Sequence, residues 1–486
     1  MSNGPGRVPL VKVRAYPAFD IHATPKFDLI KDKRAERGEK NRGGVRLCWF
    51  VDFRRRWVSL EAKLARIRNL GGGSPFSGGG YSNGYSHHPT TEKPHRQRRG
   101  GRRPRDGRDG GAGGGGWARA SEPERRPCTD FDKAYFQSYS HVGIHEEMIK
   151  DRVRTETYKA AITQHQNSIA GKVVVDVGCG TGILSIFCAQ VGAKRVYAVD
   201  ASEIAIQASA VVKANNLSDT VIVLHGRVED VEIDEGVDVI ISEWMGYMLL
   251  YESMLESVIT ARDRWLKPGG LILPSSATLY MAPVTHTDRY RDSIDFWRNV
   301  YGIDMSAMLA LAKQCAFEEP SVETISGENV LTWPHVVKQV DCYAVTIDEL
   351  KSVATRYRFK SMMRAPLHGF AFWFDVEFNG PAIFPTSTDS PSLFIGSSSN
   401  NPVDGSQRKK RSNPNEALVL STAPEDPPTH WQQTLIYLYD PVDLEQDQLI
   451  EGSVTLSQSK ENPRFMNIRL EYAAGGRAFV KESVMR

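Results

Sequence analysis

The stretch VVVDVGCGTG, residues 173–182, decides the fold class of this 486-residue chain. A run of β-branched residues leads into three glycines at alternate positions, and residues of helical period follow. This order predicts a buried strand, a tight turn and a helix. The glycines allow a ligand to lie against backbone N–H groups where the helix begins. The stretch therefore predicts a nucleotide-binding turn at the end of a strand.

The residues that follow repeat the strand–helix pattern. Residues 195–199, 221–224 and 237–241 are short β-branched runs, and the segments between them have the period and length of helices. Near-continuous apolar strands that alternate with helices are typical of a parallel sheet covered on both faces. We predict an α/β, Rossmann-like domain over residues 128–275.

Beyond residue 275 the pattern changes. Residues 369–378, 433–439 and 466–472 are strand-like and are not separated by regular helical segments. Such a succession is typical of an antiparallel barrel or sandwich. We predict an antiparallel β-barrel-like domain over residues 276–486.

One segment of this second domain has helical spacing instead. Residues 288–315 place apolar side chains at helical intervals, and we expect the segment to protrude from the β domain. Tyr290, Trp297 and Met308 would then lie outside any core. Exposed apolar surface of this kind marks a partner site.

The glycine spacing indicates the class of ligand. The pattern G-x-G-x-G, which contains Gly178 and Gly180, is shorter than the G-x-G-x-x-G of dinucleotide sites. It favours a mononucleoside such as S-adenosylmethionine, and a nicotinamide dehydrogenase remains an alternative on this motif alone. Ligands of open α/β sheets bind at the carboxyl ends of the strands. Candidates there are Asp176 on the first strand, Asp200 for the ribose hydroxyls, and Val228 with Glu229 for the adenine, where a solvated Glu229 is the alternative.

Charge is divided unequally along the chain. Residues 1–127 carry 28 basic and 12 acidic side chains, whereas residues 128–486 carry 33 and 46, a net charge of −13. Residues 71–127 contain 16 glycines interleaved with arginines, a composition that cannot bury enough apolar area to fold. We predict a basic, disordered leader over 1–127, before an acidic body that attracts cationic substrates. Helical spacing at 57–67 leaves open a membrane-surface or partner helix, beside a segment without a role.

Composition disfavours several other classes of protein. The six cysteines form no C-x-x-C pair and no regular spacing, which argues against a disulfide framework and a structural zinc site. No apolar run approaches the roughly 18 residues that a membrane span requires, and the N-terminus lacks a signal-peptide core. The sequence therefore predicts a reducing compartment, no metal and no membrane.

A loop after the fourth predicted strand carries two carboxylates in an apolar, aromatic setting. Glu243 and Glu252 bracket the residues WMGYMLLY, which include no lysine or arginine. Burying two anions together is costly unless a cation compensates them. A guanidinium is planar and bidentate, so it suits two carboxylates better than an ammonium does. The loop predicts a clamp for a substrate guanidinium, and the alternative that each glutamate pairs with a structural arginine stays open.

This loop resembles the double-glutamate loop of the type I protein arginine methyltransferases, and other motifs agree with that family in order. Residues 135–139, YFQSY, resemble its N-terminal tyrosine motif, and residues 429–431, THW, resemble its threonine-histidine-tryptophan loop. The segment 288–315 stands where the family carries its dimerisation arm. Residues 365–374 and 461–464 match one member of the family most closely.

The resemblance, which extends from about residue 135 to the C-terminus, implies a role for each matching residue. Glu243 and Glu252 would clamp the substrate guanidinium, and His430 would complete the catalytic set, paired with Asp151. Arg154 would hold the methionine carboxylate of S-adenosylmethionine. The rest of the implied cofactor pocket comprises Tyr135, His145, Met148, Asp176, Gly178, Gly180, Asp200, Val228 and Glu229.

The resemblance also implies what the protein does and where. It implies a homodimer that transfers methyl groups to arginine in basic, Arg/Gly-rich tails such as those of histones. The expected products are monomethylarginine and asymmetric dimethylarginine, and the expected location is the nucleus, with the cytoplasm possible as well. A dehydrogenase would not explain the glutamate loop together with the β domain. An RNA-binding protein with a non-catalytic methyltransferase-like domain remains the alternative, because the leader is rich in Gly and Arg.

Two features depart from the family pattern. The family usually has glutamate at the position of Asp200, and the shorter side chain raises the question of a changed cofactor affinity. Residues 390–416 form an insert that contains the run RKKR at 408–411. A nuclear-import signal, a substrate contact and a solvated loop are all open for this run. In the leader, Arg beside Gly is as suitable for automethylation as for RNA binding.

Overall fold

The computed structural model describes residues 127–380 and 418–486. The predicted leader, the helical pattern at 57–67, the insert 390–416 and Cys48 therefore lie outside the described residues, apart from residue 127. None of the described helices is both long and apolar enough to cross a membrane.

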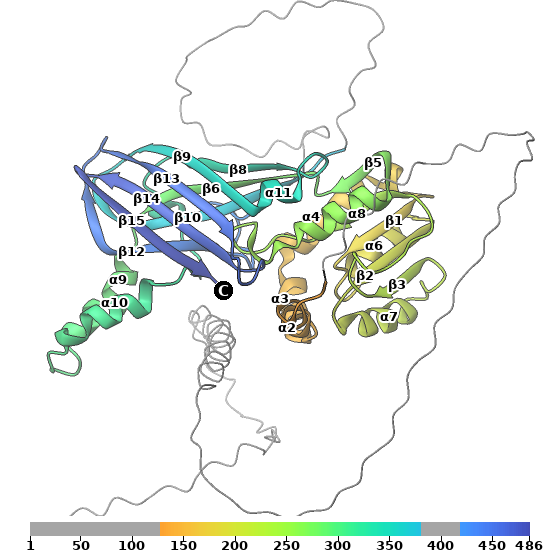
Figure 1. Cartoon of the computed structure of the whole chain (residues 1–486), viewed down its shortest axis with the longest axis horizontal. Coiled ribbons are helices and arrows are strands. Elements are labelled where there is room, and N and C mark those ends of the chain that lie inside the picture. The colour runs from red at the N-terminus through yellow and green to blue at the C-terminus, as the bar shows by residue number, and fades with distance from the viewer. Residues whose placement is uncertain (1–126, 381–417) are drawn as a thin grey trace, which may run out of the picture. The chain divides into compact units, whose positions relative to one another are not determined.

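The first part of the described chain forms the predicted α/β layer around a parallel sheet (Figure 1). Its five strands lie in the order β3-β2-β1-β4-β5, and every neighbouring pair is parallel. All five residues of β1 are buried, as expected for a central strand covered on both faces. The strands are β1 (Val173–Val177), β2 (Arg195–Asp200), β3 (Val221–His225), β4 (Val237–Ser242) and β5 (Leu266–Leu273).

Helices precede this sheet and connect its strands. Thr129 begins the first of them through a capping box with Asp132, and Asp151 caps α4 by accepting from Arg154 N at 3.0 Å. The same two carboxylates also bind side chains, since Asp132 pairs with Arg464 and Asp151 pairs with His430. The helices are α2 (Asp130–Tyr139), α3 (Val142–Lys150), α4 (Arg152–Gln164), α5 (Gln166–Ile169), α6 (Ile183–Gln190), α7 (Ile204–Ala214), η1 (Tyr251–Ser253) and α8 (Leu255–Trp265).

The second part consists of two antiparallel sheets, as the succession of strand-like runs predicts. One sheet has the order β7-β12-β10-β6-β8, with β11 paired to β10, and the other has the order β15-β14-β13-β9. The predicted boundary between residues 275 and 276 stays a prediction, although β5 ends at Leu273 and β6 begins at Ser276. The strands are β6 (Ser276–Val284), β7 (Ser321–Glu323), β8 (His335–Asp341), β9 (Ser352–Lys360), β10 (Ala365–Phe378), β11 (Leu418–Ser421), β12 (Gln433–Leu444), β13 (Leu449–Gln458), β14 (Met466–Ala474) and β15 (Arg477–Met485).

The segment predicted to protrude is helical but interrupted. It contains α9 (Thr287–Ser293), η2 (Asp295–Arg298), η3 (Ser306–Met308) and α10 (Leu309–Phe317). Two further short helices, η4 (Gly327–Asn329) and α11 (Ile347–Lys351), complete the second part. We call residues 287–317 the arm.

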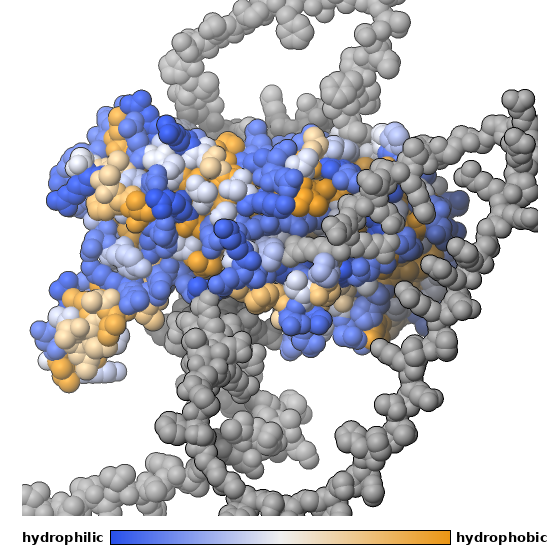
Figure 2. Space-filling view, in the orientation of Figure 1, coloured by the Kyte–Doolittle hydropathy of each residue, from blue (hydrophilic) through white to orange (hydrophobic). Residues whose placement is uncertain are grey.

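Apolar side chains gather on the surface of the arm, at the lower left of Figure 2. Tyr301 is fully exposed, Leu311 is 60% exposed and Ile303 is 58% exposed. The expectation for Tyr290 was wrong, because this ring is 7% exposed and packs on Phe317 and Tyr437 in a small core at the base of the arm. Met308 is exposed as expected, whereas Trp297 is only partly exposed.

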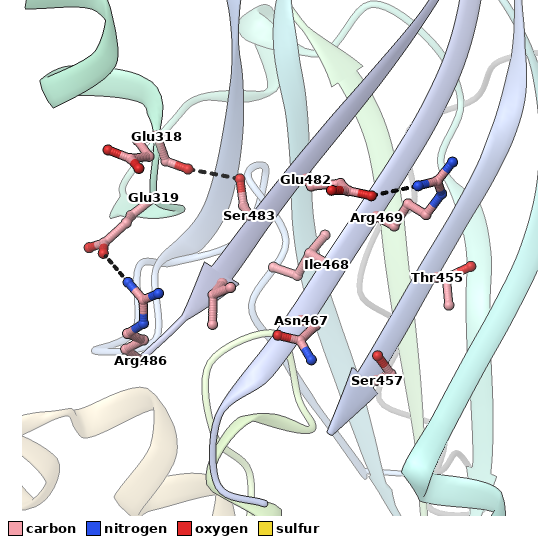
Figure 3. Close-up of a pocket in the computed structure, with 11 residues that line it drawn as sticks. Glu318, Glu319, Thr455, Ser457, Asn467, Ile468, Arg469, Glu482, Ser483 and Arg486 are labelled. Atoms are coloured by element: carbon pink, nitrogen blue, oxygen red, sulfur yellow. Dashed lines mark hydrogen bonds and ion pairs between the residues drawn. The ribbon is translucent and has the colours of Figure 1, made fainter. Parts of the chain in front are cut away.

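The last strand fastens the base of the arm to the sheet. Lys481 Nζ donates to Phe317 O at 2.5 Å, and Ser483 Oγ donates to Glu318 O at 2.9 Å. Arg486 pairs with Glu319 at 3.0 Å, and both residues line a groove of about 390 Å³ (Figure 3). A cation and a hydroxyl thus bind carbonyls where α10 ends, which is the favourable arrangement for a helix C-terminus.

Candidate active site

The glycine turn forms the floor of the candidate cofactor site. Gly178, Gly180 and Gly182 have φ angles of 73°, 55° and 82°, a region that residues with a Cβ rarely adopt. A Cβ on Gly178 would lie 2.6 Å from Met254 Cε, and one on Gly180 would lie 3.1 Å from His145 Nδ1. The turn therefore needs glycine for its conformation and for close approach, as a cradle for a flat ligand does.

Carboxylates stand at the strand ends around this turn, where the sequence predicts them. Asp200 Oδ2 accepts from Gly180 N at 2.8 Å, and its Oδ1 accepts from Ser202 N and Ser202 Oγ. Glu229 Oε1 accepts from Ser257 Oγ at 2.8 Å, so this residue is held in place and is not a freely solvated charge. Val228, beside it, is 4% exposed.

Asp176 is the fully buried member of the set. Its Oδ2 accepts from Ser185 Oγ at 2.6 Å, whereas its Oδ1 is buried and has no hydrogen-bond partner among the residues that the structure describes. Burial raises the pKa of Asp176 to about 7. An orphaned acceptor of this kind is costly in a protein interior and is tolerated at functional sites.

The raised pKa gives a testable pH dependence of stability. The folded state keeps a proton on Asp176 that the unfolded state loses at its ordinary pKa of 3.8. This contribution to stability is complete below that pKa, and it is lost as pH rises through about 7. Between pH 6 and 8, we expect Asp176→Asn to gain about 1.4 kcal/mol of unfolding free energy relative to the parent. Urea unfolding of both proteins at the two pH values measures the difference, and an unchanged difference would contradict the raised pKa.

The first glutamate of the double-glutamate loop is compensated by an arginine of the chain itself. Arg154 Nε and Nη2 each lie 2.9 Å from Glu243 Oε2, and the two side chains are 7% and 8% exposed. Arg154 Nη1 also donates to Met148 O at 3.2 Å. For Glu243, the open alternative of a structural arginine partner is therefore realised in this structure.

The second glutamate is bound by hydroxyls of the tyrosine motif. Tyr135 Oη and Tyr139 Oη donate to Glu252 Oε2 at 3.0 and 2.8 Å. Burial raises the pKa of Glu252, and the charge of Glu243 adds to that rise. Glu252 also has a φ of 75°, so its backbone adopts a conformation that is uncommon for residues other than glycine.

The threonine-histidine-tryptophan loop meets the start of α4. His430 Nδ1 lies 2.7 Å from Asp151 Oδ2, and His430 N donates to the same oxygen at 2.9 Å. Burial alone would raise the pKa of Asp151, but the hydrogen bonds from His430 and from Arg154 N outweigh it, so the pKa is lowered. Trp431 Nε1 donates to Met245 O at 2.8 Å and so fixes this loop to the glutamate loop.

Hydrogen bonds join His430, Asp151, Arg154 and Glu243 in one group, and they join Glu252, the tyrosine motif and His145 in another. The role of each predicted site residue remains a proposal. His145 is buried, and its Nε2 lies 2.7 Å from Tyr139 O, so it joins α3 to the tyrosine motif. One site residue was not predicted, namely Arg464, which binds Asp132 and Glu252 O. Its only sequence signal was the run ENPR at 461–464, which resembled the family but suggested no role.

These residues define a class of protein. A glycine cradle at a helix start and carboxylates at three strand ends fit a nucleoside with an amino-acid tail, and the adjoining carboxylate pair fits a cation. No group of three potential metal ligands occurs within residues 127–380 and 418–486. Fold and site together are those of an S-adenosylmethionine-dependent methyltransferase.

Comparison with known proteins identifies the family. The model of the arginine methyltransferase oligomerization subdomain matches residues 275–392 and 409–477, and that of ribosomal protein L11 methyltransferase matches residues 156–276. The chain is 77% identical over 367 residues to a probable protein arginine N-methyltransferase 6 of Arabidopsis thaliana, which covers 75% of this chain and 84% of the relative. The chain belongs to the protein arginine N-methyltransferase family.

Solved structures agree with this assignment. The Trypanosoma brucei PRMT1 enzyme-prozyme heterotetrameric complex with AdoHcy is similar at a TM-score of 0.60 and 32% identity, covering 72% of this chain and all of that chain. A crystal structure of PRMT6-SAH is similar at a TM-score of 0.52 and 27% identity. The match covers 68% of this chain and all of that chain. AdoHcy and SAH both denote the demethylated cofactor, and the protein is a type I arginine methyltransferase that uses S-adenosylmethionine. The predicted fold, enzyme class and cofactor are confirmed, as is the resemblance to one member of the family.

Proposed function

We propose that this enzyme methylates arginines in basic, glycine-containing tails such as those of histones, and so acts on chromatin in the nucleus. The observation that carries this proposal is the state of the two glutamates. Arg154 and the tyrosines bind Oε2 of Glu243 and of Glu252. Within the described residues, no hydrogen bond is formed to Oε1 of either glutamate, so each keeps an acceptor for a guanidinium. The net charge of −13 over residues 128–486 adds an attraction for cationic tails.

The residues of the site have distinct tasks in this reaction. S-adenosylmethionine, when bound, supplies an electrophilic methyl group on a sulfonium. Gly178 and Gly180 would carry the nucleoside, Asp200 and Glu229 would bind its ribose and adenine, and Arg154 would share its guanidinium between Glu243 and the cofactor carboxylate.

Glu243 and Glu252 would hold the substrate guanidinium and direct one nitrogen toward the cofactor site. A delocalised guanidinium is a poor nucleophile, so positioning and electrostatics supply most of the acceleration. The proton would leave through Glu243 or through the pair of His430 and Asp151. In this pair, His430 Nδ1 lies 2.7 Å from Asp151 Oδ2.

The product distinguishes this proposal from its alternatives. We expect the purified chain, given S-adenosylmethionine and a histone mixture, to form monomethylarginine and then asymmetric dimethylarginine. Mass spectrometry separates the two dimethylated forms, because the asymmetric form loses dimethylamine and the symmetric form loses monomethylamine. Loss of monomethylamine would contradict the product type. Absence of any methylated arginine, together with RNA binding, would favour the non-catalytic alternative.

The leader is proposed to act in localisation and substrate recruitment, and not in catalysis. We expect deletion of residues 1–127 to leave kcat and KM on a short arginine peptide within about twofold, because every residue placed in the site lies beyond them. Nuclear import and RNA binding of the full chain and the deletion variant test the leader itself. A folded deletion variant that is inactive on the peptide would contradict this assignment.

A further inference from the structure

The double-glutamate loop is held in a costly backbone conformation. Met248, Leu249, Glu252 and Ser253 all have positive φ angles, between 51° and 75°, although none of them is glycine. Such conformations are unfavourable for residues with a side chain, and they persist only where surrounding contacts impose them. The groups that impose this conformation therefore determine where the Glu252 carboxylate points.

The contacts that hold Glu252 and Ser253 in this conformation come from the hairpin between β13 and β14. Glu252 N donates to Arg464 O at 3.1 Å, and Arg464 Nη1 donates to Glu252 O at 2.9 Å. Ser253 Oγ donates to Pro463 O at 2.7 Å, and Gln458 Nε2 donates to Ser253 Oγ at 3.0 Å. Both backbone polar groups of Glu252 are thus bound by one residue, which lies 212 positions away in the sequence.

The same arginine also holds the helix that carries the tyrosines. Arg464 Nη2 pairs with Asp132 at 2.9 Å, and the two side chains are 18% and 8% exposed. Its guanidinium lies 3.8 Å from the ring centroid of Tyr135 and 5.3 Å from that of Phe136. Tyr135 in turn donates to Glu252 Oε2. Arg464, Tyr135 and Glu252 therefore each contact the other two. These contacts join α2, the glutamate loop and the β13–β14 hairpin.

We propose that Arg464 is a positioning residue for methyl transfer, which fixes both the backbone of Glu252 and the tyrosine helix that binds its carboxylate. This inference rests on the proposed role of Glu252 as a ligand of the guanidinium. Arg464 acts through Glu252 and Tyr135 and is not itself proposed to touch the reacting atoms. Only a planar guanidinium can pair with Asp132, donate to Glu252 O and stack on Tyr135 at once.

The proposal predicts a specific change in turnover. In Arg464→Gln, we expect kcat on an arginine peptide to fall by about 10- to 100-fold, because a small misplacement of a catalytic group is costly. Arg464→Lys should recover only part of this loss, since an ammonium keeps the charge but not the three directed contacts. The peptide KM and the affinity for S-adenosylhomocysteine should change much less than kcat. Arg469→Gln is the matched control, because Arg469 lies nearby on β14 but is 50% exposed and pairs with the exposed Glu471 and Glu482.

The pH profile supplies a readout that a purely structural role would not move. Burial raises the pKa of Glu252, hydrogen bonds from Tyr139 and Tyr135 and the charge of Arg464 oppose that rise, and Glu243 adds to it. Removing the charge in Arg464→Gln should therefore shift the acidic limb of the kcat profile to higher pH, whereas Arg464→Lys should keep it near the parent.

The outcomes separate this inference from the proposed function. If Glu252→Gln is inactive while folded Arg464→Gln keeps the parental kcat and pH profile, the positioning role is wrong and the guanidinium clamp stands. If Glu252→Gln is itself active, the clamp fails and this inference fails with it. Asp132→Asn provides a second test if Arg464→Gln does not fold, since it removes one anchor of Arg464 and should lower kcat in the same direction. Parental kcat in folded Asp132→Asn and Arg464→Lys would overturn the proposal.

Discussion

Replacing Glu252 with glutamine is expected to lower kcat by about 10³-fold or more, with cofactor binding largely intact, by analogy with other preorganised electrostatic groups. Glutamine has nearly the same shape, and its amide oxygen can still accept from Tyr135 and Tyr139, which now donate to Oε2. The lost negative charge is what would confine positive charge on the substrate guanidinium. Steady-state kinetics on an arginine peptide and calorimetric binding of S-adenosylhomocysteine measure the two effects separately.

A matched substitution shows whether the loss belongs to the site. Glu451→Gln removes an equal charge from β13, where Glu451 is 54% exposed and pairs with Arg358, and it should keep parental turnover. Turnover of Glu252→Gln within threefold of the parent would exclude the clamp.

We also expect Glu243→Gln to remove activity, but this variant tests the guanidinium clamp less directly than Glu252→Gln does. Its substitution leaves the Arg154 guanidinium, 7% exposed, without its anionic partner. Removing one member of a buried ion pair costs about 3–5 kcal/mol, because the remaining charge stays desolvated. A loss of activity in Glu243→Gln would therefore mix a catalytic effect with a loss of stability and of cofactor binding.

Local patterns in the sequence were sufficient for the sheet and the glycine turn. The run 173–182 specifies a buried strand and then a turn that only glycine can make, and both consequences depend on neighbours in the sequence. The pairing of His430 with Asp151, for which a catalytic role is proposed, was available only through family resemblance, because the two residues lie 279 positions apart.

Long-range pairing is what the sequence could not supply. The glutamate loop contains no cation, so the substrate was the natural candidate, yet Arg154 reaches Glu243 from a helix 89 positions earlier. Tyr290 has the spacing of an exposed helical face, but that face closes on Phe317 and Tyr437 once β12 passes beneath it. In both cases a partner distant in sequence decides whether a side chain is free.

Disrupting the arm is the second change with a large expected effect. The model of the family's oligomerization subdomain matches residues 275–392 and 409–477, a range that includes the arm, so we expect the arm to take part in dimerisation. We expect Leu311→Glu to convert the dimer into a monomer at micromolar concentration and to lower kcat by tenfold or more. Leu311 is 60% exposed on α10, and a charge there cannot be buried against a partner without a large desolvation cost. Light scattering measures the oligomeric state and peptide methylation measures kcat.

The partner surface for the arm is proposed on the cofactor domain, where Val142 on α3 is 65% exposed and Ile206 on α7 is 55% exposed. An arm that docks there on the second subunit closes a two-fold dimer, because each subunit offers one arm and one acceptor surface. Docking beside α3 would steady Tyr139, whose carbonyl lies 2.7 Å from His145 Nε2, and would thereby order the tyrosines that bind Glu252.

Val142→Glu should then reproduce the effect of Leu311→Glu on both the oligomeric state and kcat. Leu449→Glu is the matched control, since Leu449 is a 40% exposed leucine on β13 and should leave dimer and turnover unchanged. A monomeric Leu311→Glu protein with parental kcat would show that the arm does not support the active site, and a dimeric one would show that Leu311 is outside the interface.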